Sequence, residues 1–176
     1  MALARTELRA RATPVHSRAG FRGRARAFKT PAMAAGHAGL MRFDTKIAIA
    51  VRSDLAVWQK LNVTAFLASG IAAGIDEVAG KPYEDGSGNR YLEMFRQPAL
   101  VYTGTGEALS AVRERAVSRG MAAAVYTEEM FTTGDDDANR AVVQAVAAED
   151  LVLVGIAVYG PRNAVDKVCR GLTLHP

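Results

Sequence analysis

The stretch KIAIAVRSDLAVWQKLNVTAFLASGIAA, from Lys46 to Ala73, predicts a buried strand, a polar corner and a long helix. Lys46 to Val51 is a short apolar run rich in β-branched residues, which is typical of a strand covered on both faces. The helix then repeats apolar residues at helical spacing, so we expect one face to pack on the sheet: Leu55, Trp58, Leu61, Ala65 and Ala68.

The polar corner Arg52-Ser53-Asp54 separates the predicted strand from the predicted helix. Ser53 or Asp54 is expected to accept a hydrogen bond from the first free N–H groups of the helix. Lys60 and Thr64 lie four residues apart on another helix face, where an amine and a hydroxyl can act together. This pair is the first candidate for chemistry.

Working outward, apolar runs at Ala99 to Tyr102, Met121 to Tyr126 and Leu151 to Tyr159 predict three further strands. Helical patterns separate them, and Asp85-Gly86 predicts a hairpin turn. Alternating strands and helices favour an α/β sandwich with a mostly parallel sheet.

The formal net charge of +4 averages two unlike parts of the 176 residues. Residues 1–42 hold nine Lys or Arg and one acid, Glu7, whereas residues 43–176 hold 13 basic and 17 acidic side chains, a net charge of −4. We expect residues 1–42 to be a disordered basic tail, a targeting segment or a spurious start, and residues 43–176 to be one domain. An acidic body has no general attraction for nucleic acid.

Cys169 is the only cysteine, so no intrachain disulfide can form, which suits a reducing, cytoplasmic location. Charges interrupt the apolar stretches well before the length that a transmembrane helix needs, so no membrane contact is expected. No His/Cys set has metal-ligand spacing, and we expect neither a metal nor a cofactor. Asp135-Asp136-Asp137 is expected to cap a helix, and Gly104-Thr105-Gly106 to form a turn.

Three polar corners each follow a predicted strand: Arg52 to Asp54, Thr127 to Thr133, and Tyr159 to Asn163. Ligands of open α/β sheets usually lie beyond the carboxyl ends of strands. If these corners converge, Lys60, Glu128 or Glu129, and Thr132 surround one reacting centre.

In such a centre a carboxylate would hold the Lys60 ammonium and orient a water, and the ammonium would stabilise an oxyanion or a phosphate. The last helix, which begins behind Gly160-Pro161 with Arg162 alongside, is a possible phosphate seat. The alternative is that Lys60 and Glu128 form a surface pair without a task.

With these residues in view, residues 43–176 resemble a bacterial domain-of-unknown-function family in the peptidyl-tRNA hydrolase II superfamily. Three stretches carry the resemblance: FDTKIAIAVRSDLAVWQKLNVTAF, YTEEMFTTG and GPRNAVDKVCRGLTLHP. It implies a three-layer α/β/α sandwich around a four-stranded mixed sheet, often dimeric. Enzymes of that superfamily cleave the ester that joins a peptide to tRNA.

The resemblance also implies roles for individual residues. The helix lysine of these enzymes matches Lys60, their loop aspartate falls on Glu128, and a threonine four residues later falls on Thr132. Thr64 stands where the enzymes have a glutamine. We therefore expect Lys60, Glu128 and Thr132 to be catalytic. The residues expected to bind substrate are Arg52, Asp54, Thr64, Glu129, Arg162 and Asn163.

Three hypotheses follow. The first is a metal-independent ester or acyl hydrolase, with tRNA or an aminoacyl or peptidyl ester as substrate. The second is a non-catalytic module that binds a small anion or a protein on the same fold. The third is a structural homodimer that uses the apolar face of the Trp58 helix.

Overall fold

A computed structural model describes residues 42–176, and the expectations for the basic tail therefore lie outside the described residues. Strand β1 (Thr45–Arg52) leads into helix α1 (Val57–Gly74), as the central stretch predicts. The next elements are η1 (Asp76–Val78), the hairpin strands β2 (Tyr83–Glu84) and β3 (Arg90–Tyr91), strand β4 (Ala99–Gly104) and helix α2 (Gly106–Val117). The remaining elements are β5 (Ala122–Thr127), η2 (Glu128–Thr132), α3 (Asp136–Gln144), η3 (Ala148–Asp150), β6 (Leu153–Pro161), α4 (Arg162–Val168) and β7 (Thr173–Leu174).

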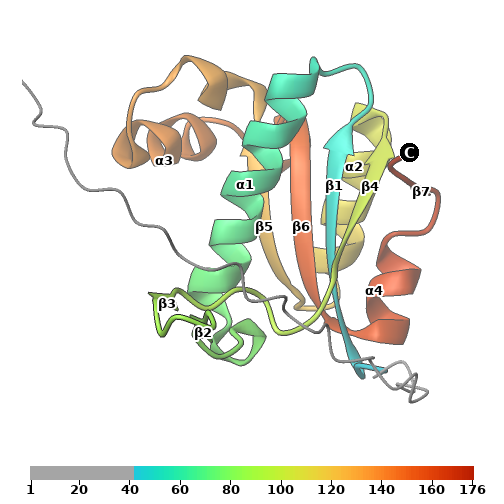
Figure 1. Ribbon diagram of the computed structural model, residues 1–176. Helices are drawn as coiled ribbons and strands as arrows, with labels where there is room; N and C mark the ends of the chain where they lie inside the picture. The colour runs from blue at the N-terminus through green and yellow to red at the C-terminus, as the bar shows by residue number, and fades with distance from the viewer. Residues whose placement is uncertain (1–41) are drawn as a thin grey trace, which may run out of the picture. The chain divides into compact units, whose positions relative to one another are not determined.

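Five strands form the main sheet in the order β5-β6-β1-β4-β7 (Figure 1). Only β1 and β4 are parallel, and β6 runs antiparallel to both of its neighbours. The prediction of four strands in a mostly parallel sheet is therefore wrong. The antiparallel direction of β6 results from the segment between β5 and β6, because α3 packs on η2 at one end of the sheet and does not cross the sheet. The chain re-enters the sheet from the end at which it left.

Helices cover both faces of the sheet, so the three-layer expectation is confirmed. Alternate residues of β1 divide between the layers: Ile47, Ile49 and Val51 join the core beneath α1, while Ala48 and Ala50 join the core beneath α2 and α4. This division follows from the twofold alternation of side chains along a strand.

Only part of the expected face of α1 packs on the sheet, since Leu55 is buried and Ala68 contacts the core, but the centre of the buried face lies elsewhere. Its buried residues are Val63, Leu67 and Ile71, whereas Trp58 and Leu61 are 63% and 67% exposed. Gly155 of β6 allows the close approach, because a Cβ there would lie 2.3 Å from Val63 Cγ1. The helix is apolar on nearly every side, so its sequence pattern does not single out one face.

Local predictions at the chain's turns hold in part. Gly120 and Gly171, which follow α2 and α4, have φ of 60° and 94°, as helix-ending glycines do. Asp135 caps α3 through its carboxylate and the N–H of Ala138. The expected cap of α1 is wrong, because the N-cap is Ala56, whose N–H donates to Gln59 Oε1 at 3.0 Å.

Candidate functional site

The carboxyl ends of β1 and β4 lie at the same edge of the sheet, because the two strands are parallel neighbours. β5 ends at this edge too, since Thr127 is paired with Leu153 at the start of β6 while Val51 is paired with Gly155. Two of the three polar corners, Arg52 to Asp54 and Thr127 to Thr133, therefore converge.

An arginine-centred cluster of charges occupies this edge. Arg52 donates through Nη1 to Glu128 Oε2 at 3.1 Å, through Nη2 to Glu128 Oε1 at 3.3 Å, and through Nε to Asp54 Oδ1 at 2.7 Å. The Arg52 side chain is 16% exposed, while the two carboxylates are 67% and 53% exposed for Asp54 and Glu128. The hydrogen bond to Glu128 raises the pKa of Arg52, and Asp54 acts in the same direction.

An open cleft of about 850 Å³ lies beside this cluster, on the face of the sheet that α2 covers. Its wall combines Arg52 and Asp54 with the first turns of α2 and the start of β6. Glu107 and Glu114 add two carboxylates, and the Thr105 hydroxyl lowers the pKa of Glu107 by hydrogen bonding to it. One cation against three acids makes the lining net negative, which favours neutral or cationic ligand groups.

Two buried threonine hydroxyls add to the polarity of the same edge. Thr103 Oγ1 of β4 and Thr127 Oγ1 of β5 have no hydrogen-bond partner among the residues that the structure describes. Buried hydroxyls without a partner are uncommon in folded proteins.

Lys60 lies apart from the arginine cluster. It sits half-buried in the first turns of α1, on the opposite face of the sheet from α2 and the cleft, and no ion pair joins it to an acid within residues 42–176. Arg52, rather than Lys60, is thus the cation that holds Glu128. The expected Lys60–Thr64 partnership takes another form, since Thr64 Oγ1 donates to the backbone carbonyl of Lys60 at 2.7 Å.

The other expected residues divide between the two ends of the sheet. Thr132 is exposed on η2, where its hydroxyl donates to the Glu129 carbonyl at 2.8 Å. Arg162 and Asn163 begin α4 beyond Pro161, which is paired with Thr45 at the start of β1. The structure therefore separates them from Arg52 by the full length of β1. Arg162 donates to the Phe43 carbonyl at 3.1 and 3.2 Å, so its guanidinium contacts the chain rather than a vacant phosphate seat.

With this geometry established, comparison with known proteins gives the family. Residues 45–176 match the model of a family described as Protein of unknown function (DUF2000). The chain belongs to the DUF2000 family. No curated protein matches it. Among solved structures, it is similar to a protein of unknown function from Agrobacterium tumefaciens strain C58, with 47% identity and a TM-score of 0.74. The match covers 77% of this chain and all (100%) of the other.

These matches do not test the resemblance to peptidyl-tRNA hydrolase II enzymes, which stays a prediction. For a DUF2000 chain, the structure also adds residues that sequence reasoning missed, namely Thr105, Glu107, Ser110 and Glu114 of α2. The signal that could have found them is the position of Gly104-Thr105-Gly106, directly after a strand that neighbours β1. The sequence predicts only a turn for that segment, because its place beside Arg52 depends on the sheet order.

No cluster of three or more His, Cys, Asp or Glu side chains within residues 42–176 has metal-site geometry. None of the helices formed by these residues is both long and apolar enough to cross a membrane.

Proposed function

We propose that this protein is a hydrolase of acyl esters whose reacting centre is the Arg52–Glu128 pair. The observation that carries the proposal is the bidentate contact between these side chains, at 3.1 and 3.3 Å, made by an arginine that lines the cleft. A carboxylate held at two points keeps one orientation, as a group that positions a water must. The resemblance of Glu128, Lys60 and Thr132 to the loop aspartate, helix lysine and threonine of peptidyl-tRNA hydrolase II enzymes supports the same chemistry.

In the proposed reaction Glu128 accepts a proton from a water that attacks the ester carbonyl carbon. Negative charge develops on the carbonyl oxygen, and the Arg52 guanidinium stabilises it at the carboxyl edge of β1. The ester bond then breaks, the leaving oxygen takes the proton that Glu128 accepted, and the alcohol and the carboxylic acid depart. Thr132 positions the substrate from η2, whereas Lys60 lies on the opposite face of the sheet from the cleft.

The charge of the cleft points to the substrate class. Asp54, Glu107 and Glu114 line it together with one arginine, so an α-ammonium group fits it better than a polyanion. We therefore propose an aminoacyl or peptidyl ester with a free amino group. A tRNA leaving group would extend away from the cleft.

The test is hydrolysis of a p-nitrophenyl aminoacyl ester and of peptidyl-tRNA by the full chain. We expect Glu128→Gln to lower the rate about 100-fold or more, since general-base catalysis contributes about that factor. Glu93→Gln is the matched control, because Glu93 is an exposed glutamate of the hairpin segment. An equal rate in wild type and Glu128→Gln would show that the Arg52–Glu128 pair is not the reacting centre. An equal rate in Lys60→Ala would remove Lys60 from it.

A second candidate is a binding module without turnover. The observation in its favour is that the hydroxyls of Thr132 and Thr64 both donate to carbonyls of their own helical turns. These hydroxyls therefore present only acceptor lone pairs to a substrate. A thermal-shift screen of small amines and anions distinguishes the candidates, since a module would be stabilised by a ligand that it leaves intact.

A further inference from the structure

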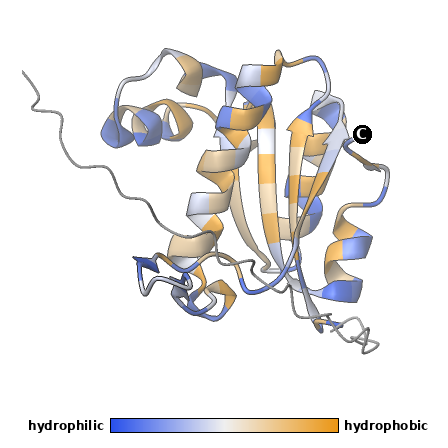
Figure 2. Ribbon diagram, in the orientation of Figure 1, coloured by the Kyte–Doolittle hydropathy of each residue, from blue (hydrophilic) through white to orange (hydrophobic). Residues whose placement is uncertain are grey.

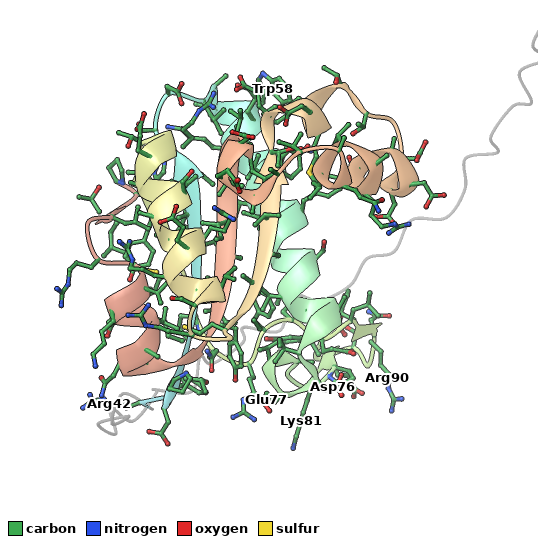
Figure 3. The ribbon with its side chains drawn as sticks, turned by 180° about the vertical axis from the view of Figure 1, so that it is seen from behind. Arg42, Trp58, Asp76, Glu77, Lys81 and Arg90 are labelled. Atoms are coloured by element: carbon green, nitrogen blue, oxygen red, sulfur yellow. The ribbon has the colours of Figure 1, made fainter. Side chains whose placement is uncertain are left out.

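A hollow of about 380 Å³ lies on the α1 face of the sheet, opposite to the cleft, among α1, β5, η2 and α3. Residues at every fourth position of α1 line it or the trough that continues from it, because residues four apart share one face of a helix: Trp58, Asn62, Phe66 and Gly70. Figure 2 shows little hydrophilic colour along α1 beyond its first turns. Figure 3 shows Trp58 at the end of the molecule where α3 lies, with Asp76 and Glu77 at the other end. The hollow therefore joins an apolar helix face to the polar start of α3.

Four aromatic rings line the hollow, and they form a connected chain. Their centroids lie 5.9 Å apart for Trp58 and Phe131, 5.2 Å for Phe131 and Tyr126, and 5.6 Å for Tyr126 and Phe66. Neighbouring ring planes are inclined by 66°, 49° and 69°, so the rings stand as angled walls rather than as a parallel stack. Tyr126 is 5% exposed, at the base, whereas Trp58 and Phe66 are 63% and 50% exposed, at the mouth. These contacts hold the rings in one arrangement before any ligand arrives.

The charged groups at the hollow are acids. Asp135 and Asp136 line it, and no Lys or Arg within residues 42–176 does so. Asp136 accepts a hydrogen bond at 2.5 Å from Arg140 of the neighbouring trough, but Arg140 also donates to Asp137 at 2.6 Å, so the start of α3 keeps a net negative charge. Burial raises the pKa of Tyr126, so its phenol stays neutral at neutral pH. Aromatic walls with an acidic rim suit an organic cation.

An apolar trough of about 540 Å³ continues from the hollow between α1 and α3. The two cavities share Phe66, Tyr126 and Met130. Beyond these residues the trough is lined largely by small or aliphatic side chains: Leu67, Gly70, Ala124, Val125 and Val143. Gly70 lets α1 lie close to β5, since a Cβ there would lie 3.1 Å from Ala124 Cβ. The trough can therefore bury a hydrocarbon chain that is joined to the cation.

We propose that the hollow binds the head group of a small quaternary ammonium compound, and that the trough holds its alkyl chain. Quaternary ammonium groups suit clustered aromatic rings, because their charge is spread over methyl groups that carry no N–H donor. A primary ammonium has three N–H donors, and ring faces do not satisfy them as carboxylates do. The inference goes beyond the hydrolase proposal, since neither Arg52 nor Glu128 lines the hollow or the trough.

Trp58 is the only tryptophan of the chain, so its fluorescence reports on the hollow directly. The full chain is titrated with choline and with 3,3-dimethyl-1-butanol, a neutral molecule of the same shape. We expect a saturable change of emission with choline and about 3–30-fold weaker binding of the neutral molecule, because the latter lacks the attraction between cation and rings. No saturable change with choline, or equal affinity for both molecules, would overturn the proposal.

Trimethylammonium compounds with butyl, pentyl and hexyl chains test the trough. Each added methylene should raise the affinity by up to about fourfold, because it buries further hydrocarbon in the trough. An affinity that does not depend on chain length would overturn the assignment of the trough.

The variant Phe66→Leu removes one ring but keeps an apolar side chain and the Trp58 reporter. It should weaken choline binding about threefold or more. Tyr83→Leu on β2 is the matched control, because Tyr83 is 48% exposed and lines neither cavity, and its affinity for choline should equal that of wild type. Far-UV circular dichroism checks that both variants fold. The same loss in both folded variants would show that choline binds elsewhere and would overturn the site.

The variants Asp136→Asn and Asp137→Asn test the acidic rim, because both residues pair with Arg140 and only Asp136 lines the hollow. Asp136→Asn should weaken choline binding about two- to fivefold, and Asp137→Asn should have the smaller effect. An equal or larger loss in Asp137→Asn would mean that the hollow does not select the cation, and would overturn the proposal. Glu128→Gln should bind choline as wild type does, so a failure of the hydrolase proposal and a failure of this site are read separately.

Discussion

Strand β1 carries a cation at each end, and the two cations have different surroundings. At the amino end Lys46 is 9% exposed and pairs with Asp166 of α4. At the carboxyl end Arg52 is nearly as buried, and its partners Asp54 and Glu128 are more than half exposed. Arg52 and Asp54 line a cleft of about 850 Å³. The amino end borders a cavity of only about 210 Å³. Because Asp166 is itself 49% exposed, the two ion pairs differ less in exposure than in the hollow beside them, and only the carboxyl-end pair adjoins a cleft of ligand size.

The polar groups of the amino end are used in holding chain segments together. Thr45 Oγ1 donates to Gln97 Oε1 at 2.8 Å, and Arg162 binds the Phe43 carbonyl. Both contacts join segments that are far apart in sequence. Polar residues thus have a structural role at one end of the sheet and a candidate chemical role at the other.

The largest expected effect concerns catalysis. Glu128→Gln should reduce ester hydrolysis about 100-fold or more, because the amide cannot accept the proton of the attacking water. Asp166→Asn, the corresponding change at the amino end, should leave the rate within about twofold of wild type at a temperature where both proteins are folded. Initial rates on one aminoacyl ester measure both. Equal losses of rate in Glu128→Gln and Asp166→Asn would show that the two ends of β1 do not differ in function.

Stability should respond in the opposite order. Asp166→Ala leaves the Lys46 ammonium buried without its acid and should lower the free energy of unfolding by about 2 kcal/mol. Glu128→Ala leaves Arg52 paired with Asp54, so we expect a loss of only about 0.5 kcal/mol. Urea denaturation measures both changes. A larger loss in Glu128→Ala than in Asp166→Ala would mean that the carboxyl-end pair is the structural one.

The variant Arg162→Ala distinguishes a structural role of Arg162 from the phosphate-binding role that the sequence predicts. It removes two hydrogen bonds to the Phe43 carbonyl and should lower the free energy of unfolding by about 1–2 kcal/mol. Inorganic phosphate should raise the melting temperature of wild type and variant equally. If phosphate stabilises wild type alone, Arg162 binds anions and the amino end also has a binding role.

Local features of this fold could be predicted from the sequence, and relations between distant segments could not. The apolar run at Lys46 to Val51 and the acidic start of α3 determine their own structures through burial and capping. Strand direction depends on whether a connection crosses the sheet. Nothing in residues 135–147 reveals that α3 stays beside η2, and the prediction of a mostly parallel sheet therefore fails at β6.

The candidate site shows the same limit. Sequence position directs attention to Arg52, Asp54 and Glu128, because each follows a strand, and the structure joins them by ion pairs. The sequence could not show that Glu128 would pair with Arg52, two residues before Asp54, and not with Lys60. That choice depends on α1 covering one face of the sheet while Arg52 lies on the other, toward the cleft lined by α2.

The smallest expected effect of a substitution is a change in the reactivity of Cys169, near the amino end of β1. Burial raises the pKa of Cys169 from 9.0 to about 11, and Lys46 and Asp166 act on it with opposite signs. At pH 8 the folded thiol should therefore react with a thiol reagent about 100-fold more slowly than the unfolded one. Because the folded pKa is the higher one, this group's contribution to stability is complete below pH 9 and is lost as pH rises toward 11. Asp166→Asn removes a charge that raises the pKa and should speed the reaction, whereas Glu128→Gln should not change it. Equal acceleration by both variants would mean that the two ends of β1 are coupled.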